Sequence, residues 1–135
     1  MHTVFLGLGA NMGNRKRTIR QAINRIEELI GTIERRSALY ETKPWGFRSS
    51  NLFINACVRC STELTPRQVL TVTQKIEQEL GRTAKSQSGV YQDRMIDIDI
   101  LLYDDLVLNE PDLKIPHPLI QERDFVMIPL KECYN

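Results

Sequence analysis

Apolar and polar positions alternate along this chain with two different periods, and each period predicts a kind of element. In residues 2–9 the apolar side chains recur at every second position, which predicts a first strand. In residues 15–30 they recur every three to four positions, which predicts an amphipathic helix with Gly31 as its C-cap. Residues 32–40 are then expected to form a second strand, and 41–51, which contain proline, glycine and serine, a long loop.

The second half of the chain repeats the strand and helix patterns. Residues 52–61 predict a third strand, and Thr65 with Gln68 has the spacing of a capping box before a helix that runs to Leu80. The other segments expected from the pattern are a polar loop at 82–93, a fourth strand at 95–103, a short strand at 106–108, an irregular proline-containing segment and a last apolar piece at 125–130.

The predicted order of elements is β-α-β-β-α-β, which is the ferredoxin-like arrangement of the α+β class. We expect an antiparallel sheet with both helices packed on one face, in a single domain spanning residues 1–135. Loops of about a dozen residues are uncommon in so small a domain and are usually functional. The segments 41–51 and 82–93 are therefore expected to be active-site loops that close over bound substrates.

The strand predicted at 95–103 contains the first candidate chemistry. Side chains two apart share one face of a strand, so Asp97 and Asp99 are expected side by side, ~6.6 Å apart, with Leu101 on the same face. Two close carboxylates raise each other's pKa unless a cation lies between them, and Mg²⁺ accepts carboxylate ligands with phosphate oxygens. A magnesium site and an amphipathic strand with a hydrated acidic face both fit this pattern.

Composition excludes several classes of protein. Hydrophobic content of 41% and charged content of 26% are typical of a soluble globular protein, and a net charge of +1 argues against a nucleic-acid or membrane-surface binder. The N-terminal apolar stretch lacks a basic flank and is too short to span a bilayer. Three cysteines, an odd number, indicate reduced thiols and a cytoplasmic location.

Two short motifs resemble known sites but do not fit them. Cys57 and Cys60 form a C-x-x-C within a predicted strand, where residues three apart face opposite sides, so a structural role is expected. The glycines of residues 7–13 resemble a dinucleotide fingerprint, but their spacing is wrong and the later strand pairing contradicts a parallel sheet.

Basic side chains are grouped around the acidic strand. Arg15 and its neighbours on the first helix are expected on a solvated face, whereas another set brackets the second loop and the acidic strand, where forked donors suit a nucleotide triphosphate. His117 lies between two prolines, and a rigid turn and a ligand-binding role both remain open. The bracketing set consists of Arg82, Lys85, Arg94 and Arg123.

Together these residues resemble one family, the 6-hydroxymethyl-7,8-dihydropterin pyrophosphokinases of folate biosynthesis. The Arg-x-x-Asp-hydrophobic-Asp element of Arg94, Asp97 and Asp99 is the most specific match. The matching segments are 7–11, 40–46, 53–56, 73–77, 81–82, 93–100, 115–118 and 123–125.

The resemblance implies an enzyme, an ATP-dependent pyrophosphokinase that transfers pyrophosphate from ATP to the hydroxymethyl group of the dihydropterin and releases AMP. It implies two Mg²⁺ ions held by Asp97 and Asp99, with Arg82 and Arg94 also catalytic. Small-molecule partners, a monomeric state and no nucleic-acid or membrane partner are expected. The implied pterin-binding residues are Thr42, Lys43, Trp45, Phe53, Asn55 and Phe125, and the implied ATP-binding residues are Gln74, Glu77, Lys85, His117 and Arg123.

The chain departs from the family pattern at a few positions. Residues 91–94 read Tyr-Gln-Asp-Arg instead of Trp-Gly-Pro-Arg, and Ala84 stands where many relatives have a second arginine, with Lys85 as a substitute. Phe53 replaces a frequent tyrosine, which keeps stacking but loses a hydroxyl. The alternative from another class is a non-enzymatic ferredoxin-like module that binds a ligand or RNA, although an RNA reader would have exposed aromatics on central strands and a basic surface.

Overall fold

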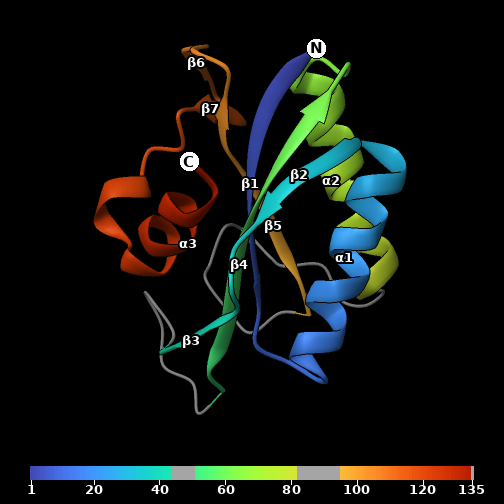
Figure 1. Ribbon diagram of the computed structural model, residues 1–135, viewed down its shortest axis with the longest axis vertical. Coiled ribbons are helices and arrows are strands. Elements are labelled where there is room, and N and C mark those ends of the chain that lie inside the picture. The colour runs from blue at the N-terminus through green and yellow to red at the C-terminus, as the bar shows by residue number, and fades with distance from the viewer. Residues whose placement is uncertain (44–50, 82–94, 135) are drawn as a thin grey trace.

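The computed structural model describes residues 1–43, 51–81 and 95–134 (Figure 1). Its elements are, in order, β1 (His2–Ala10), α1 (Arg15–Leu29), β2 (Gly31–Arg36), β3 (Tyr40–Thr42), β4 (Phe53–Thr62), α2 (Pro66–Gly81), β5 (Asp97–Tyr103), β6 (Leu108–Glu110), β7 (Leu113–Ile115), the 3-10 helix η1 (Ile120–Glu122) and α3 (Asp124–Tyr134).

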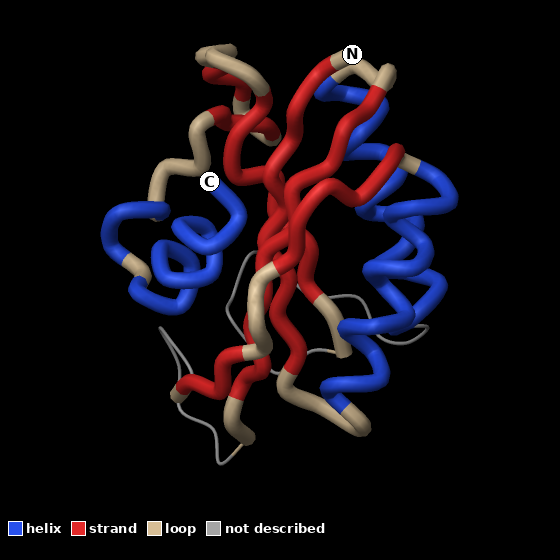
Figure 2. The backbone as a smooth tube through the Cα atoms, viewed as in Figure 1, coloured by secondary structure: helices blue, strands red, loops and turns tan. Residues whose placement is uncertain are grey.

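The main sheet has the order β2-β4-β1-β5, and β3 also pairs with β4. All of these neighbouring strands are antiparallel. Helices α1 and α2 lie together on one face, whereas α3 lies on the other (Figures 1 and 2). Strands β6 and β7 form a separate two-stranded sheet. The predicted ferredoxin-like α+β fold, with the two long helices on one face, is confirmed.

Each face of the sheet has its own buried cluster. On the α1 and α2 side, the strand residues Leu6, Ile54 and Ile98 pack in a large aliphatic core with Ile19 of α1 and Ile76 of α2. The cluster on the other face consists of Phe5, Cys57, Leu101, Ile120, Leu130 and Cys133. Since successive strand residues alternate between these clusters, membership of a cluster shows the face on which each side chain lies.

Both long helices begin with a side-chain cap. The Asn14 side chain accepts a hydrogen bond from the Arg17 N–H at 3.2 Å before α1. At α2, Thr65 Oγ1 accepts from the Gln68 N–H at 3.2 Å and Gln68 Oε1 accepts from the Thr65 N–H at 2.9 Å. The predicted capping box is therefore present and satisfies backbone donors of the first turn.

The second predicted strand, 32–40, is wrong as a continuous element. The chain forms β2 and β3 instead, and Ser37 lies between them. The Ser37 N–H donates to the Cys57 oxygen and the Cys57 N–H donates to Ser37 Oγ, both at 2.9 Å. A side-chain hydroxyl thus replaces a backbone acceptor, and this interrupts the ladder between Arg36 and Tyr40.

Gly31 is not a C-cap. The C-cap of α1 is Ile30, in right-handed helical conformation, and Gly31 is the first residue of β2. A Cβ on Gly31 would lie 1.9 Å from the Ser61 carbonyl oxygen, so the close approach of two strands accounts for glycine here.

Two smaller predictions near the C-terminus also need correction. The short strand expected at 106–108 is displaced to β6, and the segment expected to be irregular contains β7. The last apolar piece is part of α3, which includes the buried Pro129. No helix in the described part of the chain is long and apolar enough to cross a membrane.

Candidate active site

The candidate site lies on the face of the sheet that α3 contacts, where β1 carries glycines. Gly7 pairs with Asp99 and Gly9 with Asp97 in the ladder between β1 and β5. Gly9 also pairs with Asn55 of β4. Because directly opposed residues project to the same side of a sheet, the two carboxylates and the Asn55 amide flank a stretch of bare backbone.

The predicted common face of Asp97, Asp99 and Leu101 is confirmed. Ile98 and Ile100 lie in the cluster under α1 and α2, whereas Leu101 belongs to the opposite cluster. Both aspartates are half-buried. Their alternation with buried isoleucines directs the carboxylates away from the main core.

The aspartate pair has the donor chemistry for magnesium. Two carboxylates of intermediate exposure on one face can bind Mg²⁺ while leaving positions for phosphate oxygens, as this hard cation prefers. Among the described residues, no group of three or more His, Cys, Asp and Glu side chains is arranged as a metal site. The fit therefore rests on the pair together with ligands from a bound nucleotide.

Glu77 is linked to the same strand. From α2, its Oε2 accepts a hydrogen bond from the Ile98 N–H at 2.7 Å, and this N–H lies between the two aspartates. Gln74 lies exposed one turn earlier on α2. The helix thus anchors the backbone that carries the carboxylates.

His117 lies between β7 and η1 and is held at both its backbone and its ring. Its N–H donates to the Leu101 oxygen at 3.0 Å, and Nδ1 accepts from the Leu119 N–H at 3.2 Å. Burial lowers the pKa of His117, nearby Arg123 lowers it further, and Asp97 partly opposes both effects. Both effects favour the neutral ring, and because Nδ1 accepts a hydrogen bond, the neutral ring carries its proton on Nε2.

Arg123 and Phe125 lie where η1 meets α3. Arg123 is buried, with 7% of its surface exposed, and its guanidinium carbon is 5.5 Å from the centroid of the Phe125 ring. A cation over an aromatic face at this distance is attracted by the ring quadrupole. Arg123 thus lies beside Phe125, a predicted pterin-binding residue. Its charge also lowers the pKa of His117, a predicted ATP-binding residue.

Phe53, Asn55 and Thr42 are brought together at the start of β4. Thr42 pairs with Phe53, and Asn55 Nδ2 donates to Thr42 Oγ1 at 2.6 Å. A Cβ on Gly9 would be 3.2 Å from Asn55 Oδ1 and 3.6 Å from Phe53 Cδ1, so both side chains lie over β1. Lys43 follows directly and is exposed.

The structure thus gathers the predicted residues of β3, β4 and β5 and those around η1 on one face. Four predicted residues, Trp45, Arg82, Lys85 and Arg94, lie outside the described residues, as does most of both predicted loops.

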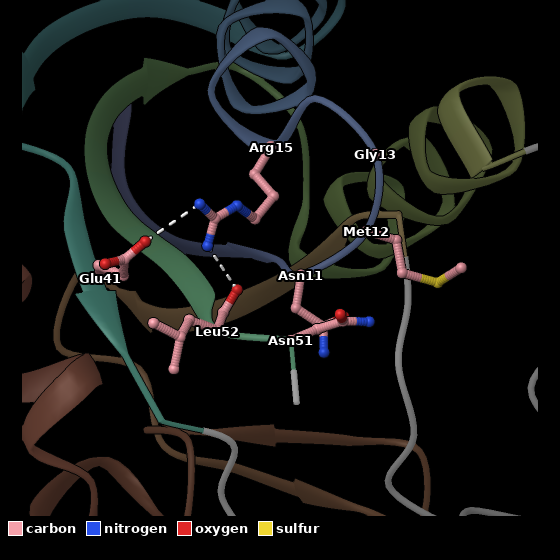
Figure 3. Close-up of a pocket in the computed structure, with 7 residues that line it drawn as sticks. All are labelled: Asn11, Met12, Gly13, Arg15, Glu41, Asn51 and Leu52. Atoms are coloured by element: carbon pink, nitrogen blue, oxygen red, sulfur yellow. Dashed lines mark hydrogen bonds and ion pairs between the residues drawn. The ribbon is translucent and has the colours of Figure 1, made fainter. Parts of the chain in front are cut away.

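A neighbouring feature was missed by the sequence analysis. A cavity of about 420 Å³ lies beside the N-terminus of α1 (Figure 3) and is lined by Asn11, Met12, Gly13, Arg15, Glu41, Asn51 and Leu52. Arg15 was expected on a solvated face, but it forms an ion pair with Glu41. Since the two residues lie on separate elements, no local spacing predicts this contact.

The predicted orientation of Cys57 and Cys60 toward opposite faces is confirmed. Cys57 and Cys60 are free and buried, and they belong to clusters on opposite faces of the sheet. They have no geometry for a shared zinc ion.

Known proteins of one name are similar to this chain over almost its whole length. The chain is 46% identical over 133 residues to 2-amino-4-hydroxy-6-hydroxymethyldihydropteridine pyrophosphokinase of Porphyromonas gingivalis, covering 98% of this chain and 90% of that protein. It is 44% identical over 132 residues to the protein of the same name from Aquifex aeolicus, covering 98% and 80%.

Among solved structures, that of wild-type Plasmodium falciparum HPPK-DHPS matches with a TM-score of 0.75 and 16% identity. The match covers 97% of this chain but 41% of that one, so this chain spans well under half of the longer protein, and the likeness concerns the fold. The model of the 7,8-dihydro-6-hydroxymethylpterin-pyrophosphokinase (HPPK) family matches residues 5–135. This chain therefore belongs to the HPPK family.

Proposed function

We propose that this protein transfers the pyrophosphoryl group of ATP to the hydroxymethyl oxygen of 6-hydroxymethyl-7,8-dihydropterin in folate biosynthesis. The hydroxymethyl oxygen forms a bond to the β-phosphorus of ATP and gives up its proton, while the bond from the β-phosphorus to the α-phosphate oxygen breaks and AMP leaves. The proposal rests mainly on one observation, that Asp97 and Asp99 lie on the same face of the sheet as Phe53 and Asn55. Carboxylates that could bind a metal–phosphate group are thereby next to side chains that could bind a flat heterocycle.

Asp97 and Asp99 hold the phosphate side of the site in this proposal. Two Mg²⁺ ions bound there would neutralise charge on the phosphate oxygens and orient the attack. Glu77 holds the strand between the carboxylates through the Ile98 N–H. His117, neutral at physiological pH, offers Nε2–H as a donor without adding charge.

The remaining nucleotide-side roles follow from the family resemblance. Arg123 would contribute a buried positive charge beside His117. Arg82 and Arg94 would stabilise charge on the transferring group, as preorganised donors do. Gln74 and Lys85 complete the proposed set.

The pterin side combines flat contacts with a polar rim. Phe53 and Phe125 would stack on the ring, because aromatic side chains suit a planar heterocycle. The Asn55 side chain can both donate and accept at the ring edge. Its amide Nδ2 donates a hydrogen bond of 2.6 Å to Thr42 Oγ1, which orients it. Backbone groups of Thr42, Lys43 and Trp45 would supply further partners.

We also propose that residues 1–135 act as one catalytic domain and as a monomer, with small molecules as substrates. A cytoplasmic location is consistent with the three free cysteines, which a reducing compartment preserves.

One assay tests the function. Purified protein, ATP, Mg²⁺ and the dihydropterin are incubated, and AMP and pterin diphosphate are quantified. We expect AMP and pterin diphosphate in equal amounts, with neither formed when the dihydropterin is omitted. Formation of ADP, or AMP formation that does not depend on the dihydropterin, would contradict the proposal.

A further inference from the structure

Arg15 connects three elements at the edge of the site. It is the first residue of α1, its Nη1 donates to the Leu52 carbonyl oxygen at 2.7 Å, and its Nη2 lies 3.0 Å from Glu41 Oε2 (Figure 3). About a third of the side chain, 29%, is exposed. One guanidinium therefore joins the start of a helix to the middle residue of β3 and to the residue preceding β4.

Both partners of Arg15 are next to proposed pterin residues. Glu41 precedes Thr42, and Leu52 precedes Phe53. In the ladder Glu41 pairs with Ile54 and Thr42 pairs with Phe53. Because neighbouring strand residues project to opposite faces, Arg15 contacts this strand pair on the face opposite to Phe53 and Thr42.

The cavity explains why these polar contacts matter. It is about 420 Å³ in volume and borders Arg15, Glu41 and Leu52, so these residues have open space on one side. A side chain that borders a void lacks van der Waals partners on that side. The ion pair and the hydrogen bond then add to the β3–β4 ladder as a restraint on where β3 and the start of β4 lie.

We propose that Arg15 is a positioning residue for the pterin half of the site. It clamps Glu41 and the Leu52 carbonyl at a fixed separation, and so sets where Phe53 and Thr42 are presented on the opposite face. The planar fork of arginine reaches two acceptors at once, whereas the single ammonium of lysine is not preorganised to do so. This inference rests on the proposed function, because it assigns the pterin to that face.

The experiment compares Arg15→Ala and Arg15→Lys with Arg20→Ala, a matched control at an exposed position of the same helix. Pterin affinity is measured in the presence of a non-hydrolysable ATP analogue, and nucleotide affinity is measured separately. Thermal unfolding of each variant is recorded. These readouts separate a positioning role from a general loss of stability.

We expect Arg15→Ala to weaken pterin binding about three- to tenfold, the range of a partly exposed ion pair with one charge-assisted hydrogen bond. Nucleotide affinity should stay within about twofold of the wild type, as expected for a site that the clamp does not touch. Arg15→Lys should fall between Arg15→Ala and the wild type, and Arg20→Ala should match the wild type.

A second variant keeps the test decisive if Arg15→Ala does not fold. Glu41→Gln retains size and an acceptor but removes the charge, and it should weaken pterin binding in the same direction. Where Arg15→Ala folds, the loss in Arg15→Ala/Glu41→Gln should be smaller than the sum of the single losses, because both act through one contact.

Two results would overturn the inference. One is equal loss of pterin and nucleotide affinity, which would indicate general destabilisation, and the other is pterin affinity in Arg15 and Glu41 variants equal to that of Arg20→Ala. Failure of the wild type to form AMP is a separate outcome that contradicts the proposed function itself.

Discussion

At the scale of single residues, His117 shows how the fold holds one protonation state. The Leu119 N–H donates to Nδ1, so that nitrogen cannot carry a proton without losing the bond. Burial and the nearby Arg123 lower the pKa of the ring, and Asp97 offsets only part of this. A neutral ring can donate a directed hydrogen bond from Nε2 whose strength does not vary with pH near neutrality.

The lowered pKa of His117 predicts a pH dependence of stability. A base whose folded pKa is depressed contributes stability that is fully present above its unfolded pKa, ~6.5, and is lost as pH falls through the folded pKa. His117→Asn keeps an acceptor near Nδ1 but does not titrate. We therefore expect the unfolding free energy of the wild type, relative to that of His117→Asn, to decrease as pH falls from about 7.5 to about 5.

Urea unfolding of both proteins at several pH values measures this difference. A difference that stays constant would mean that folding does not lower the pKa of His117, and one that increases on acidification would mean that folding raises it.

At the scale of elements, two glycines with different surroundings should respond in opposite directions to alanine. At Gly31 a Cβ would lie 1.9 Å from the Ser61 oxygen, whereas at Gly81, the last residue of α2, the nearest atom of the described residues outside the helix is Met95 Cβ at 4.0 Å. We expect Gly31→Ala to destabilise the protein by ~1–3 kcal/mol or more through overpacking. Gly81→Ala should stabilise it by ~0.4–1 kcal/mol by reducing the entropy of the unfolded chain.

Thermal and denaturant unfolding of the two variants test this pair. Thr32→Ala is the control for position, because it alters β2 next to Gly31 without adding a Cβ. Equal stability of Gly31→Ala and Thr32→Ala would show that β2 moves away from β4 at little cost.

The first turn of α3 carries a second prediction at this scale. Phe125 lies there under the guanidinium of Arg123, at 5.5 Å. Since aromatic stacking contributes ~0.5–1.5 kcal/mol beyond area burial, Phe125→Ala should weaken pterin binding about tenfold. Binding of a non-hydrolysable ATP analogue should be unchanged.

Ile128→Ala is the matched control on α3, because Ile128 is exposed, at 50% of its surface. Calorimetric titration with each ligand is the measurement. If both ligands lose affinity equally in Phe125→Ala, Phe125 acts in the core and not on the pterin.

At the scale of the whole molecule, the two faces of the sheet separate stability from chemistry. Most of the buried aliphatic residues pack under α1 and α2, whereas Asp97 and Asp99 project to the face that α3 contacts. Substitutions of these carboxylates should therefore leave global stability nearly intact, since they remove like-charge repulsion and no core contact.

Asp97→Asn and Asp99→Asn test this separation. We expect melting temperatures equal to or above that of the wild type, with turnover reduced about a hundred- to a thousandfold, as when one electrostatic group of a site is lost. Mn²⁺ affinity in the presence of ATP should fall in parallel. Asp105→Asn, at an exposed position just after β5, is the control and should keep full activity.

Local periodicity predicted much of this structure because strands and capped helices depend on nearby residues. The common face of Asp97, Asp99 and Leu101 follows from a period of two, and the start of α2 follows from the spacing of Thr65 and Gln68. The pterin and nucleotide roles came from motifs shared with a family, and they remain predictions.

Contacts between distant segments could not be predicted in this way. The break at Ser37 depends on hydrogen bonds with Cys57, and the contacts of Arg15 depend on where β3 and β4 place Glu41 and Leu52. Each involves polar groups whose partner is chosen by the folded sheet. Likewise, the apolar run at 125–130 did not reveal that α3 covers a second face.

The bare backbone of β1 bears on how readily this site could evolve resistance to a drug. A compound that rests on Gly9 touches main-chain atoms, which no substitution can remove. A side chain added at Gly9 would meet Asn55 Oδ1 at 3.2 Å and Phe53 Cδ1 at 3.6 Å, so it would disturb the same groups that we assign to the natural substrate. A mutation that expels an inhibitor from this stretch would therefore also penalise the organism that carries it.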